Sequence, residues 1–369
     1  MRYIKPYYYK NFKCIADKCP STCCAGWQII IDDETLKKYS NEKDDFSHRL
    51  KNSIDWEEGA FFQNSGRCAM LNDNNLCDLV TAKGEEFLCK TCHMYPRHIE
   101  EFEGVREFSL SLSCPVAADI ILKDTNKLIF NIEEDDKEDP LADEFEDFDF
   151  FMHTQLEQVR DLLFSIIQNR DLSIDERMAY IMDIAKKIQV NLDNGELYKV
   201  EEILNFVPSK CHISICDRYD SAVDSYKLFN ELEVLEKAWP DVLISLKENL
   251  YSTSLENYSN IRKEFYSSFI DNLSLEKWEI FKEQLLMFFV YTYFCGAVYD
   301  DCVYSKLALA TFSVFFIEEI IISTWLSNHK QISLEECIEI SYKYAREVEH
   351  SDINLNILEE NFMKRFDLL

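Results

Sequence analysis

Glycine is scarce in this sequence, which has only seven glycines in 369 residues. None of them forms the Gly-rich turn between a strand and a helix that holds the phosphates of a dinucleotide, so a Rossmann-type cofactor site is not expected. Only Gly195 and Gly296 follow residue 133. Because glycine destabilises helices, its near absence there favours long helices in the C-terminal part.

Basic residues are also in short supply: 39 Lys and Arg stand against 68 Asp and Glu, and the net charge is −29. Nucleic acids bind to basic surfaces, so we expect no nucleic-acid partner. An acidic protein attracts basic protein segments instead. The charge therefore favours a lysine-bearing protein as the partner.

Long apolar runs are missing as well. The two longest, residues 285–298 and 307–317, fall short of the roughly 20 residues that span a bilayer. We expect two buried core helices and no transmembrane segment, while peripheral contact with a membrane remains open. The opening MRYIKPYYYKNF lacks the apolar core of a secretory signal, which predicts a cytoplasmic protein with reduced thiols.

Cysteine, in contrast, is abundant, with 14 residues. In a reducing compartment this number indicates metal or redox chemistry rather than disulfides. Residues 14–24, CIADKCPSTCC, nearly match the radical-SAM signature C-x3-C-x2-C, but Gly26 stands where the third cysteine would be. Most of the later, scattered cysteines are expected to act simply as small buried apolar residues. These later cysteines are Cys211, Cys216, Cys295, Cys302 and Cys337.

Four N-terminal segments carry the candidate metal ligands. A C-x2-C pair directs two thiolates at one ion, but only one such pair is present, so the irregular spacing favours an iron–sulfur cluster over zinc, with unliganded thiols as a third possibility. Nine thiols exceed one four-ligand site, which leaves either two centres or some cysteines without metal. The candidates are Cys14, Cys19, Cys23, Cys24, Cys68, Cys77, Cys89, Cys92 and Cys114.

Two of these cysteines, Cys23 and Cys24, are adjacent in the sequence. Successive side chains of an extended chain point to opposite sides. We therefore expect that the two thiols do not both face one metal, and that one of them serves a second centre, a turn or the surroundings of the first.

The cysteine motifs resemble those of a known family. FKCIADKCPSTCCAGWQIIID, GRCAMLNDNNLCDL, LCKTCHMYPR and SLSLSCPVAA, between residues 12 and 118, look like the N-terminal part of the bacterial flagellin lysine N-methylases. The pattern is shared with a smaller family of CxxCxxCC zinc- or iron-chelating domains. The resemblance implies S-adenosylmethionine-dependent methylation of flagellin lysines, supported by a [4Fe–4S] cluster. One departure is Val116, where the family usually has Glu.

Other side chains near these motifs are weaker candidates. Tyr95 and Arg97 could hold the methyl donor, although Arg97 could equally anchor its loop. A lysine ammonium must lose a proton before it attacks a methyl group, and Asp17, Asp32 or Asp33 could accept that proton; surface or helix-cap roles are favoured for all three. No catalytic residue is assigned.

For three further features a purely structural role is favoured or is weighed equally with a functional one. His93 beside Cys92 is expected to be exposed rather than a ligand. Trp27 could shield a cluster from water or simply pack in a core. Residues 291–301, YTYFCGAVYDD, could line a lysine channel, but core packing is favoured.

The predicted fold is α+β and mostly α. An acidic stretch, residues 133–149, has eleven Asp or Glu in seventeen positions and is expected to separate two parts. Residues 1–132 form a cysteine-rich metal module with short strands, and residues 150–369 form an α-helical domain. Strands are expected at 26–32, 104–114 and 127–133, with a hairpin at 68–77.

Helical spacing of apolar residues predicts the elements of the second part. Capping boxes at Ser173 and Ser333 mark two helix starts, and Pro240 marks a third. The predicted helices are 150–169, 173–191, 221–238, 240–250, 274–298, 302–327 and 333–348. The function that these observations favour is flagellin lysine N-methylation. The alternative is a non-catalytic zinc- or iron-binding protein whose helical domain recognises a partner.

Overall fold

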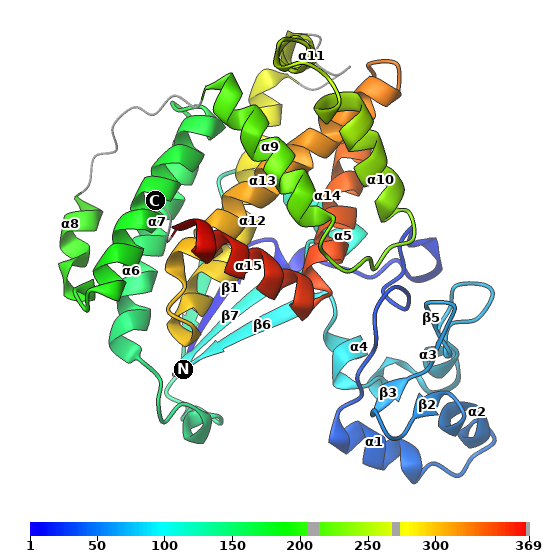
Figure 1. Ribbon diagram of the computed structural model, residues 1–369. Coiled ribbons are helices and arrows are strands. Elements are labelled where there is room, and N and C mark those ends of the chain that lie inside the picture. Colours follow the sequence, from blue (N-terminus) through cyan, green and yellow to red (C-terminus); the bar gives the residue numbers. More distant parts are fainter. Residues whose placement is uncertain (206–213, 268–273, 367–369) are drawn as a thin grey trace.

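A computed structural model describes residues 1–205, 214–267 and 274–366 (Figure 1). The fold is α+β and mostly α, as predicted. Helices form the larger part, a small sheet lies against them, and a lobe of short elements projects at one end, at the lower right of Figure 1. Cys211 lies outside the described residues.

The sheet joins the N-terminus to the helical part. Its four strands have the order β6-β7-β1-β8, with β1 parallel to β7 and antiparallel to β8. The strands expected at 104–114 and 127–133 are confirmed as β7 and β8, whereas β1 and β6 were not predicted. The bounds are β1 Arg2–Pro6, β6 Arg97–Phe102, β7 Val105–Leu110 and β8 Phe130–Glu134.

One hydrophobic core includes the sheet and the helices. Ile4 and Leu110 from the sheet belong to the same buried cluster as the apolar side chains of the helical part. Residues between 29 and 92 form a second, smaller core of their own. The predicted boundaries at residues 132 and 149 remain a prediction, while the packing places residues 4–12 and 102–128 with the helices.

The strand predicted at 26–32 is wrong. Ile29 and Ile31 are buried and Ile30 is exposed, as the alternation suggested, but the segment forms only an isolated bridge between Ile30 and Ala60. The hairpin predicted at 68–77 is reduced to one bridge, from Leu71 to Cys77. The short strands of the lobe are β2 Ile54–Asp55, β3 Ala60–Phe61, β4 Gln63–Asn64 and β5 Arg67–Cys68.

Short helices position the cysteine segments. Asp32 caps the first of them, because its side chain accepts a hydrogen bond from the Thr35 backbone N–H. Cys89 and Cys114 stand at the N-cap positions of two others. The bounds are α1 Asp33–Ser40, α2 Ser47–Lys51, α3 Asp78–Lys83, α4 Lys90–Met94 and α5 Pro115–Leu122.

The predicted helices are largely confirmed. Both capping boxes are present, at Ser173 with Glu176 and at Ser333 with Glu336. The helix expected at 221–238 begins earlier and ends at Phe229, and α8, α11 and α15 were not predicted. The bounds are α6 Phe150–Ile167, α7 Ile174–Asp193, α8 Val200–Leu204, α9 Ile215–Phe229, α10 Trp239–Leu246, α11 Leu255–Ser267, α12 Leu275–Tyr293, α13 Val303–Ser327, α14 Leu334–Glu349 and α15 Asp352–Phe366.

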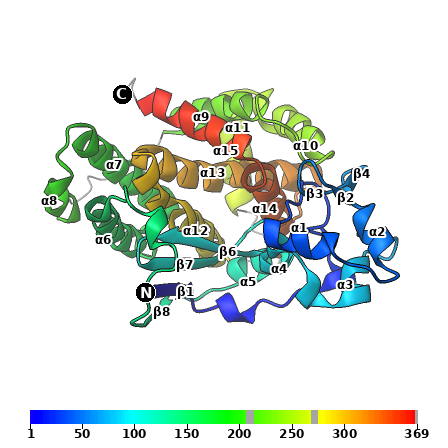
Figure 2. The same ribbon diagram turned by 90° about the horizontal axis from the view of Figure 1, so that it is seen from below.

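The central element is α13, which packs against α7, α12 and α15. Figure 2 shows it running through the middle of the helical part, with the sheet and α5 on one side of α12. By length and composition α13 could cross a membrane, but 83% of its most apolar 18-residue stretch is buried inside the structure. This burial confirms the interpretation as a core helix.

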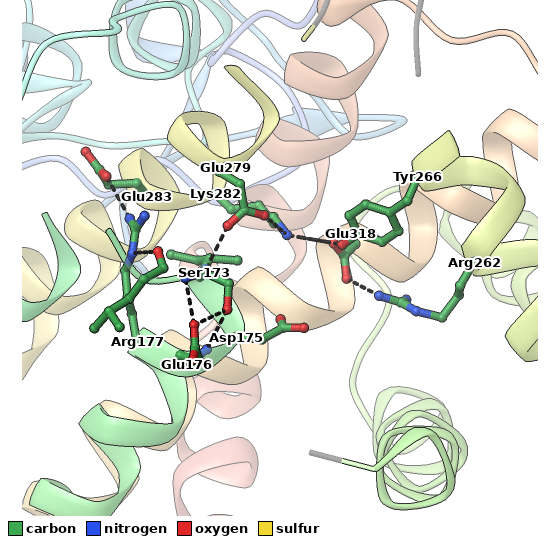
Figure 3. A network of polar contacts seen from close by, with 12 residues as sticks. Ser173, Asp175, Glu176, Arg177, Arg262, Tyr266, Glu279, Lys282, Glu283 and Glu318 are labelled. Atoms are coloured by element: carbon green, nitrogen blue, oxygen red, sulfur yellow. Dashed lines mark hydrogen bonds and ion pairs between the residues drawn. The ribbon is translucent and has the colours of Figure 1, made fainter. Parts of the chain in front are cut away.

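Buried ion pairs connect the helices around α13. Glu318 accepts hydrogen bonds from Arg262 at 2.6 Å and from Lys282 at 3.1 Å, and it also contacts Tyr266 (Figure 3). Burial alone would raise the pKa of Glu318, but Lys282, Arg262 and Arg218 hold it well below its usual range. The ionised carboxylate therefore ties α9, α11 and α12 to α13.

The acidic stretch begins at the end of β8, where Glu133 and Glu134 pair with β1, and it meets the sheet again at Asp139. Most of its residues are exposed, but Asp139 pairs with the buried Arg106 of β7 and accepts a hydrogen bond from the Gly104 backbone at 2.8 Å. This contact fixes the path of the chain between β8 and α6.

Candidate functional site

Backbone hydrogen bonds bring the cysteine segments together. The Cys68 N–H donates to the Cys24 carbonyl at 2.8 Å, and the Gly26 N–H donates to the Gly66 carbonyl at 2.9 Å. The Asp78 N–H donates to the Met70 carbonyl at 2.8 Å, which holds Cys77 near Cys68. Segments that are far apart in the sequence therefore meet in the small lobe.

Five thiols gather in the small core, and we call them the inner group. Cys68 and Cys89 are buried members of that core, and the other three pack against it. Burial, with smaller contributions from the neighbouring thiols, raises the pKa of Cys68 to about 12. The inner group consists of Cys24, Cys68, Cys77, Cys89 and Cys92.

Four other thiols lie where the opening loop meets the helical part, and we call them the interface group. Cys114 belongs to the large core. Burial raises its pKa to about 11, with smaller contributions from Cys19 and Cys14. The Cys24 thiol and burial raise the pKa of Cys23, with smaller contributions from Cys14 and Cys114. The interface group consists of Cys14, Cys19, Cys23 and Cys114.

The adjacent pair Cys23 and Cys24 joins the two groups. The Cys23 thiol donates a hydrogen bond to Cys24, which lowers the pKa of Cys24 to about 7 and raises that of Cys23. The two backbones are held differently: the Cys23 carbonyl accepts from Trp27 Nε1 at 2.6 Å, and the Cys24 carbonyl accepts from Cys68. All nine candidate ligands thus lie in two connected groups.

Thiolates are the ligands that iron–sulfur clusters and zinc require, so the donor set fits either metal group in kind. Burial penalises a thiolate, and a bound cation would offset that penalty. In the parts of the chain that the structure describes, no three Cys, His, Asp or Glu side chains are already arranged as ligands of one ion. Which cysteines bind directly stays a prediction.

Gly26, where the radical-SAM spacing is broken, has a backbone conformation and a neighbour that disfavour any side chain. Its φ of +92° favours glycine, and a Cβ there would lie 3.0 Å from Arg346 Nη2. Arg346, on α14, donates to the Ala25 carbonyl at 2.7 Å and to Glu236 at 2.7 Å. A cysteine at position 26 would therefore clash with the arginine that holds the opening loop.

An aromatic cluster lies beside the interface group. The Trp27 ring stacks on His350 with 5.2 Å between centroids and lies 5.7 Å from Tyr95. Ser113 Oγ is 3.0 Å from the Tyr95 hydroxyl and 2.8 Å from His350 Nε2. Burial lowers the pKa of His350 to about 3, so the imidazole is neutral at physiological pH.

A buried carboxylate completes this region. Glu349 accepts a hydrogen bond from Ser111 Oγ at 2.8 Å, and the Ser111 hydroxyl also contacts Ser113 at 2.5 Å. Burial raises the pKa of Glu349 to about 7. Hydroxyls therefore link Glu349 to the aromatic cluster.

The side chains of the two candidates for holding a methyl donor have different neighbours. Tyr95 belongs to the aromatic cluster, whereas the Arg97 guanidinium lies over the Phe12 ring at 5.1 Å from its centroid. The contact of Arg97 favours the anchoring role, and its part in cofactor binding stays a prediction.

The candidate bases and the remaining candidate residues lie at a helix cap, at the surface or in the core. Burial would raise the pKa of Asp32, but hydrogen bonds from the Lys90 and Thr35 backbones outweigh it and lower the pKa, which suits a helix cap. Asp17, Asp33 and His93 are exposed. Residues 291–301 are mostly core: Tyr291 donates to the Phe108 carbonyl, and Phe294 and Cys295 are buried.

Sequence reasoning missed the contribution of the end of α14. Arg346, Glu349 and His350 all contact N-terminal segments there. The run REVEHS, residues 346–351, was the available signal, because several ionisable side chains crowd the point where a helix ends. Nothing in that run indicated which segment they would meet.

A model of the FliB lysine N-methylase C-terminal domain family matches residues 160–369. That range covers more than half of the chain. The chain belongs to this family. Membership assigns it to an enzyme family of protein-lysine methyltransferases, and the matched range includes α14 with Arg346, Glu349 and His350.

Individual relatives agree with the assignment. The chain is 30% identical over 133 residues to the flagellar biosynthetic protein FliU of Salmonella muenchen, covering 34% of this chain and 79% of that protein. It is also 30% identical over 133 residues to the lysine-N-methylases of Salmonella choleraesuis and Salmonella typhimurium, and the match spans only 33% of their length. No solved structure matches the chain.

The family model does not extend to the cysteine motifs, which precede residue 160. The resemblance of those motifs therefore stays a prediction, separate from the match of the helical part.

Proposed function

We propose that this protein transfers methyl groups from S-adenosylmethionine to lysine side chains of flagellin or of another lysine-bearing protein, with an iron–sulfur cluster held by its N-terminal cysteines. The observation that carries the proposal is the family match over residues 160–369. The names of the relatives, a flagellar biosynthetic protein and two lysine-N-methylases, support the flagellar substrate.

The chemistry imposes two requirements on the site. The lysine ammonium must first lose a proton to a base. The free amine nitrogen then forms a bond to the methyl carbon while the bond from that carbon to the sulfonium sulfur breaks, which leaves S-adenosylhomocysteine. The strongly acidic protein, with a net charge of −29, favours the approach of a lysine-rich surface.

The aromatic cluster is the part of the described chain that we propose for the methyl donor. Aromatic faces attract cations such as a sulfonium, and the rings of Trp27, Tyr95 and His350 are only partly buried. The Ser113 hydroxyl beside them can orient polar groups. In this proposal Tyr95 keeps its predicted role.

In this proposal the N-terminal cysteines provide the thiolate ligands of the iron–sulfur cluster. A [4Fe–4S] cluster takes thiolates from several segments, and the nine N-terminal thiols gather from the four segments that carry the motifs. When bound with three thiolate ligands, the cluster would supply an iron that can take a polar group of the methyl donor. The interface group lies beside the aromatic cluster, since Trp27 Nε1 donates to the Cys23 carbonyl.

Methyl transfer to flagellin tests the proposal. The protein is purified without oxygen, loaded with iron and sulfide, and incubated with flagellin and isotope-labelled S-adenosylmethionine. We expect labelled methyl groups on lysine side chains in the mass spectrum of the flagellin digest, and none when the donor is omitted. A folded, metal-loaded protein that methylates no lysine would favour the non-catalytic metalloprotein instead.

A further inference from the structure

The sheet ends in β8, which pairs with β1 on one side only (Figure 2). We propose that the free edge of β8 binds an extended, lysine-bearing segment of the partner protein, which adds to the sheet as a further strand. The inference deepens the proposed function: it rests on a lysine-bearing protein as the substrate and names the surface that holds this protein.

The register of β8 shows which of its backbone groups are free. The Asp135 N–H donates to the Met1 carbonyl at 3.0 Å. The Tyr7 N–H donates to the Ile129 carbonyl at 3.1 Å. Hydrogen-bonded pairs alternate along an antiparallel ladder, so every second residue of β8 directs its N–H and C=O away from β1. No backbone group of the described residues pairs with these outward groups, which belong to Phe130, Ile132 and Glu134.

Apolar side chains lie along the same edge. Ile132 is 61% exposed, although it shares a face of β8 with Phe130, whose ring lies 4.5 Å from the ring of Tyr291 in the core. An exposed apolar edge strand invites pairing with another chain. A strand laid beside β8 would cover Ile132 and bond to the outward backbone groups, which is the mode of binding called β-augmentation.

The charge at the end of β8 selects a basic strand. Glu133 pairs with Lys5 at 3.2 Å. Opposite charges on neighbouring strands attract each other, so lysines of an added strand would find free carboxylates here. Three exposed acids form no ion pair with any Lys or Arg that the structure describes, and these are Glu134, Asp136 and Glu138.

The free carboxylates are held close to the edge. They lie between β8 and Asp139, which accepts a hydrogen bond from the Gly104 backbone at 2.8 Å. A second copy of the protein is a poorer occupant than a basic segment, because two chains with a net charge of −29 repel each other.

The direction of the strands links this edge to the proposed methyl-transfer site. Phe130 at the start of β8 stands opposite Pro6 at the end of β1, and β1 is parallel to β7. The start of β8 therefore lies toward the end of the sheet at which β7 leads into Ser111 and Ser113. A strand along β8 would run from the acidic residues toward that end.

Peptide binding to the full chain tests the inference. The probe is a short fluorescent peptide in which lysine and valine alternate, and its counterpart with glutamate in place of lysine is the control. Fluorescence anisotropy is measured without S-adenosylmethionine. We expect the lysine peptide to bind, with an affinity that falls as the salt concentration rises, and the glutamate peptide not to bind.

Two variants alter the edge and one serves as a matched control. Ile132→Pro removes an outward N–H and leaves the hydrogen bonds to β1 in place, and it should raise Kd about tenfold. Glu134→Lys reverses a free charge and should also weaken binding. Glu248→Lys makes the same charge change at an exposed position just after α10 and should leave Kd unchanged.

Circular dichroism shows whether each variant folds. If Ile132→Pro does not fold, Glu134→Lys decides alone. Unchanged peptide binding by a folded edge variant overturns the inference. So does a dimer of the unmodified protein that Ile132→Pro or Glu134→Lys dissociates, because a second copy would then occupy the edge.

The methyl-transfer assay separates the two proposals. With both correct, the KM for flagellin rises in the edge variants while kcat stays the same. Methyl transfer with an unchanged KM in folded edge variants would overturn the inference and leave the proposed function standing. Binding of the lysine peptide at this edge without any methyl transfer would do the reverse.

Discussion

Arg346 Nη2 donates a hydrogen bond to the carbonyl oxygen of Ala25 at 2.7 Å, across 321 residues of sequence. The arginine side chain is 3% exposed and is paired with Glu236 at 2.7 Å. A single buried guanidinium thereby joins α14, which lies in the matched family domain, to the loop that carries Cys23 and Cys24.

Arg346→Ala removes the contact and leaves Glu236 and the Ala25 carbonyl without their donor. The Glu236 side chain is 37% exposed, so the cost comes mainly from the charge-assisted hydrogen bond to the Ala25 carbonyl, about 1.5–3 kcal/mol. We expect a lower midpoint in denaturant and a reduced metal content after anaerobic purification. Arg365→Ala, at an exposed arginine of α15, should change neither, and equal behaviour of the two variants would contradict this role of Arg346.

Gly26→Ala tests the close approach between the loop and the arginine. The new Cβ would lie 3.0 Å from Arg346 Nη2 at a φ of +92°, so strain and crowding add to about 1–3 kcal/mol. Gly195→Ala is the matched control, because its φ is +68° but no atom lies within 4 Å. Thermal unfolding should show the larger loss for Gly26→Ala.

Glu318→Ala tests the ion pairs around α13. It removes the buried carboxylate that Arg262, Lys282 and Arg218 share, although each keeps a second partner, Glu319, Glu279 and Asp175 respectively. Loss of a buried charge partner costs roughly 3 kcal/mol. Glu264→Ala, which removes an exposed partner of Lys330, should cost at most about 0.5 kcal/mol. Chemical denaturation of both variants gives the comparison, and a small effect of Glu318→Ala would show that the network adds little to stability.

The carboxyl group of Glu349 predicts a pH dependence of stability. Burial raises its pKa to about 7, whereas a glutamate in the unfolded chain has a pKa of about 4.3. The folded state therefore holds this proton more tightly. The stabilisation by the bound proton is complete below the unfolded pKa and is lost as the pH rises to about 7, by at most roughly 4 kcal/mol.

Glu349→Gln checks that sign, because the amide stays neutral at every pH. The free energy of unfolding of the unmodified protein should fall more steeply than that of the variant between about pH 4.3 and 7, and the two profiles should run parallel above that range. Parallel pH profiles throughout would mean that Glu349 does not titrate as the structure predicts.

The local signals in the sequence predicted the helical part well. Ser173 and Ser333 sit in capping boxes that need only neighbouring residues, and both helices begin there. The sequence also predicted the alternating burial of Ile29, Ile30 and Ile31, of which only Ile30 is exposed. The prediction of a strand at 26–32 was wrong nevertheless. A strand needs a row of backbone pairs with a neighbouring strand, and this segment forms one isolated bridge, from Ile30 to Ala60.

The site depends on contacts that no local pattern encodes. β1 pairs with β7 through Arg2 and Val105, and this pairing places Cys114, just after β7, in the same body as the N-terminus. The contact between Arg346 and Ala25 joins opposite ends of the chain. The sequence identified the cysteines as candidate ligands. Their division into two groups became visible only in the folded structure, where segments that are distant in the sequence meet.

The most direct measurement is the intact mass of flagellin after incubation with the anaerobically loaded protein and S-adenosylmethionine. The account predicts flagellin molecules heavier by one or more methyl groups, with the methyl groups on lysine nitrogens and with S-adenosylhomocysteine formed in equal amount. Flagellin of unchanged mass, in the presence of folded protein that retains its iron, would contradict it.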